Sequence, residues 1–139
     1  MYLFMKLNLG FFFLAPLFAS CSNSRDLASS AKAEEFEGQW YGSWSWQPNH
    51  TATIRISGKQ AIVSQLPVVQ GLDDRNIRSV TAEGETRFYA AYGPKGLPCI
   101  LLSFPDVREM VPIFITNDKH QLYYSVSDDR LYRIRFNRR

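Results

Sequence analysis

Few residues in this chain of 139 are of the types that carry catalysis or bind metal ions. The chain has two histidines, His50 and His120, and two cysteines, Cys21 and Cys99. A nucleophilic mechanism needs a base beside the nucleophile, but each histidine follows turn-forming residues, which predicts exposure in a loop. No His or Cys pair has the spacing of a zinc site. We therefore expect a protein that is not an enzyme and uses no metal and no cofactor.

The paired acids also lack an arrangement suited to chemistry. Asp73-Asp74 and Asp128-Asp129 fall in stretches with turn composition, and adjacent turn residues are poorly placed for general acid and base work. Cys99 lies within an apolar run, where a thiol is expected to pack as a small hydrophobic group.

The position of Cys21 has a different explanation. An apolar run, residues 7–18, has the length of a secretory h-region and is too short to span a bilayer. It ends in Leu17-Phe18-Ala19-Ser20-Cys21, which resembles the lipobox of bacterial lipoproteins. The resemblance implies that residues 1–20 are a signal peptide and that Cys21 carries the lipid anchor, palmitate included. It also implies an outer membrane lipoprotein facing the periplasm, because Ser22 and not Asp follows the cysteine.

Ordinary secretion is the alternative. Cleavage after Ala19 would leave Cys21 free to form a disulfide with Cys99 in an oxidising compartment. In both cases residues 21–35, polar and small, are expected to form a flexible tether ahead of a domain at 36–139. The expected partners are the membrane, through the anchor, and an envelope protein or small apolar ligand; nucleic acid is not expected.

Positive charge is concentrated at the C-terminus. Residues 130–139 contain five arginines and no acid, whereas residues 21–129 contain 10 basic and 13 acidic residues. Such a segment could touch anionic lipid headgroups or an acidic partner. It could equally be a solvated edge strand that charges protect from aggregation.

Alternating apolar residues predict an all-β domain. Trp40, Trp44 and Trp46 share one parity in the first segment, so a strand would point them to one face. Turn residues separate the segments, and no connection is long enough for a parallel crossover. Pro112 indicates an edge or a bulge. We expect a small antiparallel meander barrel of eight or nine strands. The nine candidate strands are residues 39–46, 51–57, 60–66, 76–82, 86–92, 98–104, 110–116, 121–127 and 130–136.

The first of these segments also carries a resemblance. Phe36-Glu37-Gly38-Gln39-Trp40-Tyr41 resembles the F-x-G-x-W-Y opening of the lipocalins. The resemblance implies a lipocalin-like β-barrel in which Trp40 plugs the closed end. It further implies an arginine from the last strand stacked on Trp40, and Arg133 or Arg135 could supply it.

The aromatic residues suggest where a ligand would bind. Five are expected near the open end of the barrel and could bind a small apolar ligand by burial. They are Trp44, Trp46, Phe88, Tyr92 and Tyr124. The alternative is that these rings fill the barrel. The protein would then be an interaction module, such as an inhibitor, an immunity-type binder of a hydrolase or toxin, or an accessory of an envelope complex. An open or filled interior distinguishes the two functions.

Overall fold

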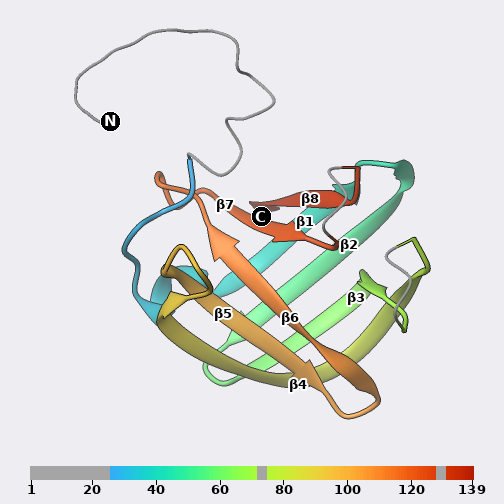
Figure 1. Cartoon of the computed structure of the whole chain (residues 1–139), viewed down its shortest axis with the longest axis horizontal. Helices are drawn as coiled ribbons and strands as arrows, with labels where there is room; N and C mark the ends of the chain where they lie inside the picture. Colours follow the sequence, from blue (N-terminus) through green and yellow to red (C-terminus); the bar gives the residue numbers. More distant parts are fainter. Residues whose placement is uncertain (1–25, 72–74, 128–130) are drawn as a thin grey trace, which may run out of the picture.

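The chain folds into a closed barrel of eight antiparallel strands in sequence order (Figure 1). The computed structural model describes residues 26–71, 75–127 and 131–139. Each strand pairs with the next, and β8 pairs back to β1 through Trp40–Arg138 and Tyr41–Asn137. The expected all-β meander barrel is therefore confirmed. The strands are β1 (Gly38–Trp44), β2 (Gln47–Ser57), β3 (Gln60–Val69), β4 (Ile77–Tyr92), β5 (Leu97–Phe104), β6 (Val107–Ile115), β7 (Gln121–Ser125) and β8 (Arg133–Arg138).

Buried and less buried side chains alternate along several strands of the barrel, β1 among them. In β1, Trp40 and Trp44 are buried, while Gln39 before Trp40 and Ser43 before Trp44 are exposed. Antiparallel pairing then fixes which turns meet at each end. The Trp40 end holds the start of β1, the β2–β3 and β4–β5 turns and the end of β8. The Trp44 end holds the β1–β2 and β5–β6 turns.

The barrel has eight strands because β4 is continuous. We expected Glu83-Gly84-Glu85 to form a turn between two strands, and this is wrong. Gly84 lies inside the 16-residue β4, paired with Ala61 of β3. A Cβ at Gly84 would lie 2.1 Å from the carbonyl oxygen of Ser103, so glycine here permits close approach of β5.

The segment before β1 packs against the barrel from residue 26 onward, so the expected tether to residue 35 is corrected. Leu27 pairs with Thr116, and the amide of Ala28 donates to the carbonyl of Ile115 at 2.8 Å. Both side chains are buried. A short 3-10 helix, η2 (Ala33–Phe36), leads into β1. Figure 1 shows this segment, in blue, outside the strands.

Residues 1–25 lie outside the described residues, and with them the predicted signal peptide and Cys21. Within the described residues, no helix has the length and apolar character needed to cross a bilayer.

The interior of the barrel is filled by its own side chains. Trp40, Phe36 and Phe136 are each 0% exposed. Aliphatic side chains from every strand except β1 and β4 complete this fully buried set. Side chains of this size close-pack the interior of an eight-stranded barrel, which has room for little else. The aliphatic members are Ile54, Ile56, Val63, Leu66, Leu102, Ile113, Ile115, Leu122 and Ile134.

Candidate functional site

The Trp40 end is closed by a stacked pair. The indole N–H of Trp40 donates to the carbonyl of Phe36 at 3.0 Å. The guanidinium of Arg138 lies over the ring, 4.1 Å from its centroid. Its two terminal nitrogens donate to the carbonyls of Glu37 at 2.6 Å and Glu35 at 3.1 Å. Arg138 therefore joins the last strand to the segment that precedes β1.

Neither arginine that we expected to stack on Trp40 does so. Arg133 and Arg135 have the opposite parity to the buried Ile134 and project outside the barrel. Arg135 lies over the ring of Tyr123, 5.4 Å from its centroid, and pairs with Asp26 at 3.2 Å. The Nε atom of Arg133 is buried without a hydrogen-bond partner among the described residues.

Trp44 and Trp46 belong to an aromatic cluster at the other end. Their ring centroids are 5.2 Å apart, and His50 stacks on Trp44 at 4.7 Å. Tyr132 meets Trp46 edge-on at 5.1 Å. Trp46 lies in the β1–β2 turn and His50 lies in β2, whereas we expected the reverse. These rings pack on one another, with Trp44 buried and His50 exposed, so they cover the Trp44 end.

The polar atoms of this end are also occupied. Trp44 donates its indole N–H to the carbonyl of Gln65 at 2.9 Å. The hydroxyl of Tyr124 donates to the carbonyl of Pro67 at 2.8 Å and the side chain is 3% exposed. Burial raises the pKa of Tyr124, and the nearby charge of Glu109 acts in the same direction. Tyr124 is therefore a satisfied core residue.

Phe88 and Tyr92 lie at the Trp40 end, away from Trp44 and Trp46. The ring of Phe88 meets Phe36 edge-on at 6.0 Å, and Tyr92 lies 5.7 Å from Tyr89. The five predicted ligand-binding residues are thus divided between the two ends, because β4 runs antiparallel to β1. The structure does not bring them together into one pocket.

The remaining candidates for chemistry, Asp118, His120 and Cys99, are held in a hydrogen-bonded turn or buried. Thr116 donates its hydroxyl to Asp118 at 2.7 Å, and the amide of His120 donates to the same carboxylate oxygen at 3.0 Å. These bonds, the backbone amide first, lower the pKa of Asp118. Cys99 is 0% exposed, and burial raises its pKa to about 12. Across the described ranges, no three His, Cys, Asp or Glu residues gather as a metal site.

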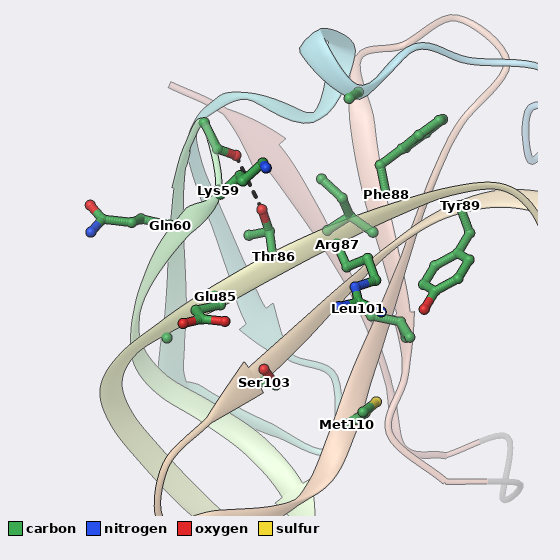
Figure 2. Close-up of a pocket in the computed structure, with 14 residues that line it drawn as sticks. Lys59, Gln60, Glu85, Thr86, Arg87, Phe88, Tyr89, Leu101, Ser103 and Met110 are labelled. Carbon is green, nitrogen blue, oxygen red and sulfur yellow. Dashed lines mark hydrogen bonds between the residues drawn. The ribbon is translucent and has the colours of Figure 1, made fainter.

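A groove of about 760 Å³ lies beside β4, at the Trp40 end (Figure 2). The β2–β3 turn, β4, β5, β6 and η2 all contribute to its lining. Phe88 and Tyr89 project to opposite sides of β4, and Arg87 lies beside Leu101. Lys59 and Arg87 bring positive charge, Glu85 brings negative charge, and none of the three makes a salt bridge with a described residue.

The groove adjoins a free strand edge that the sequence did not reveal. The β3–β4 ladder ends at Gln60–Glu85. One residue further on, Thr86 donates its amide to the carbonyl of Lys59 at 2.9 Å and its hydroxyl to the carbonyl of Gly58 at 3.1 Å. From residue 87 to residue 92, β4 pairs only with β5 among the described strands. Strand β4 has 16 residues and β3 has 10, so β4 extends past its neighbour.

The backbone at this edge can accept a further strand. The amide of Thr86 points toward β3, since it bonds Lys59. Backbone groups point to the same side at every second residue of an antiparallel strand. The N–H and C=O of Phe88 therefore face the open side of β4, next to the groove.

Comparison with known proteins found no relative of this chain. No protein-family model matches the chain, and neither a curated protein nor a solved structure matches it. The likeness to the lipocalins accordingly stays a resemblance of the six residues 36–41 within an eight-stranded barrel.

Proposed function

We propose that this protein is a non-catalytic envelope lipoprotein that binds a partner protein on the outside of a filled barrel. An extended segment of the partner adds to the free edge of β4 from residue 87 to residue 92. The observation that carries the proposal is the projection of β4 past β3, which leaves strand backbone unpaired beside a groove.

Strand addition matches the chemistry of this edge. Unpaired N–H and C=O groups of an edge strand pair readily with an extended peptide, and neighbouring side-chain sites give specificity. Here Phe88 presents its backbone to the open side, while Leu101 and Tyr89 supply apolar surface in the groove. Lys59 and Arg87 favour a segment with acidic residues.

The filled interior supports this function over transport of a small molecule inside the barrel. The fully buried aliphatic side chains of β2, β3 and β5 to β8 occupy the space that a carrier would keep for its ligand. A small apolar ligand remains the second candidate, bound in the groove instead. The volume of the groove, about 760 Å³, falls within the usual range for such sites.

The location rests on Cys21. We propose that Cys21 is acylated and holds the barrel at the periplasmic face of the outer membrane. Changing Cys21 to Ser should release a folded, soluble protein, as measured by fractionation. Mass spectrometry should find lipid on Cys21 of the wild type. An unmodified Cys21 in the membrane fraction would contradict the anchor.

Two variants of one residue test strand addition. Phe88→Pro removes the ring and the backbone N–H that faces the open edge, whereas Phe88→Ala removes the ring alone. Both variants lose the contact with Phe36, so their stabilities should fall together. Only the proline variant also loses a donor to the added strand.

A photo-reactive residue reports the partner in intact cells. It replaces Gln60, which is exposed in the lining of the groove, or Thr51, an exposed control on β2 near the Trp44 end. We expect one protein adduct from position 60, present with Phe88→Ala and lost with Phe88→Pro, and none from position 51. Equal adducts with the two Phe88 variants would disprove strand addition. A small molecule that co-purifies and is displaced by Phe88→Ala would favour the second candidate.

A further inference from the structure

Charge is divided unequally between the two sides of the barrel. Strands β7, β8, β1 and β2 are consecutive around the barrel and together contain four arginines and no acidic residue. Strands β4 to β6, on the other side, balance three arginines against three glutamates. We call the outer surface of β7, β8, β1 and β2 the cationic wall.

Three arginines of these strands point outward, and a fourth from the C-terminus joins them. Arg55 lies opposite Gln39 in the β1–β2 ladder, and the amide of Arg139 donates to the carbonyl of Gln39 at 3.0 Å. Arg133 and Arg135 project from β8. The remaining arginine of these four strands, Arg138, stacks on Trp40 instead.

These arginines are not edge protection. Strand β8 is paired on both sides, with β7 and with β1, so it is not the edge that the sequence allowed. Among the salt bridges of the described residues, the wall makes one, between Arg135 and Asp26. Like charges on one surface repel each other unless a partner of opposite charge covers them.

The start of the described chain lies on this wall. Asp26 contacts Arg135 at 3.2 Å, and the amide of Asn117 donates to the carbonyl of Asp26 at 2.6 Å. Asp26 follows Cys21 by only five positions. Five residues span at most roughly 18 Å even when fully extended. A lipid on Cys21 would therefore hold Asp26, and the wall beside it, close to the bilayer.

We propose that the cationic wall lies against the bilayer and binds the anionic headgroups of lipids through Arg55, Arg133 and Arg139. This inference rests on the lipid anchor of the proposed function. Arginines near an anionic surface attract it within about one Debye length, roughly 10 Å at 0.1 M salt. Short attachment and positive charge on the same side give the barrel one orientation on the membrane.

The orientation has a consequence for the groove. In a closed ring of eight strands in sequence order, β5 lies across from β1. With β1 toward the bilayer, the free edge of β4 and its groove face away from the membrane. They are then accessible to a soluble or periplasmic partner.

Vesicle binding tests the wall without the lipid. The full chain carrying Cys21→Ser is mixed with vesicles of phosphatidylcholine alone, or with 30 mol% (about one lipid in three) phosphatidylglycerol, and sedimented. The test variant is Arg55→Gln with Arg139→Gln. The control variant is Arg87→Gln with Arg108→Gln, which makes the same change in charge on β4 and β6. Any contribution from residues 1–20 is common to all of these proteins.

We expect binding to prefer anionic vesicles and to weaken as salt is raised. The test pair should lower the partition coefficient roughly 25-fold, and the control pair only a few-fold. Equal losses from the two pairs, or no preference for anionic vesicles, would overturn the proposal. Thermal melting confirms that both pairs are folded. Lipid analysis of wild-type Cys21 tests the anchor separately, so a failed anchor and a failed wall give different results.

Discussion

Arg138 and Trp40 face each other across the seam that closes the barrel, with the guanidinium carbon 4.1 Å from the ring centroid. The pair joins three parts of the chain. Trp40 donates to the carbonyl of Phe36, and Arg138 donates to the carbonyls of Glu35 and Glu37. The pair thus holds together the first strand, the last strand and the segment that precedes the first strand.

Replacing Arg138 with Gln should destabilise the barrel. The variant loses the stacking on Trp40 and the two hydrogen bonds to backbone carbonyls, which together predict a loss of about 1–2 kcal/mol in the free energy of unfolding. Urea denaturation measures it. Arg133→Gln is the matched control and should change stability by less than about 0.5 kcal/mol, since it breaks no described hydrogen bond. If Arg133→Gln lost more stability than Arg138→Gln, the stacking role would not belong to Arg138.

Replacing Trp40 should cost more than replacing Arg138. Trp40 is 0% exposed, so Trp40→Ala leaves a large cavity and should reduce stability by about 3–5 kcal/mol. Trp40→Phe keeps much of the ring but leaves the carbonyl of Phe36 without its indole donor, so an intermediate loss is expected. Urea unfolding distinguishes the three proteins. A loss below about 1 kcal/mol for Trp40→Ala would show that the ring is not a core residue.

The alternation of residues was sufficient to predict the fold class, because buried and less buried side chains alternate along much of β1, β2, β6 and β8. The same alternation could have predicted which arginine stacks on Trp40. Ile134 and Phe136 point inward, so Arg138 shares their side of β8, whereas Arg133 and Arg135 cannot reach Trp40. Parity within residues 133–138 is therefore enough to identify Arg138 from the sequence alone.

The five residues predicted to bind a ligand lie at two ends of the barrel, for a reason that no single strand reveals. Assigning a turn to Glu83-Gly84-Glu85 reverses the direction of the residues that follow. That reversal would carry Tyr92 to the Trp44 end. Because Gly84 is instead inside β4, Phe88 and Tyr92 lie at the Trp40 end. The free edge of β4 depends on the lengths of two neighbouring strands, and no local pattern encodes that difference.

Gly84 therefore provides a direct test of the continuous strand. A methyl group at this position would lie 2.1 Å from the carbonyl oxygen of Ser103, so Gly84→Ala should push β5 away at a cost of about 1–3 kcal/mol or more. Gly58→Ala is the control, since a methyl group there meets nothing within 4 Å. Its cost comes only from the left-handed backbone and should be about 1 kcal/mol. Equal melting temperatures for the two variants would contradict the close approach of β4 and β5.

The buried thiol of Cys99 should make the barrel sensitive to alkali. Burial raises the pKa of Cys99 from 9.0 to about 12, so the folded protein keeps the proton where the unfolded chain loses it. The stabilising contribution is complete below pH 9 and is lost as the pH rises toward 12. Burial raises the pKa of Tyr123 and Tyr124 as well, which acts in the same direction at higher pH.

Two measurements in a Cys21→Ser background, where Cys99 is the single thiol, check this expectation. A thiol reagent at pH 8 should react with the urea-unfolded chain and leave the folded protein almost untouched, because Cys99 is 0% exposed. Between pH 9 and 11, the free energy of unfolding should fall more steeply than in Cys99→Ala, by at most about 1.4 kcal/mol per pH unit. Rapid modification of the folded protein, or identical slopes in the two proteins, would mean that this thiol is open to solvent.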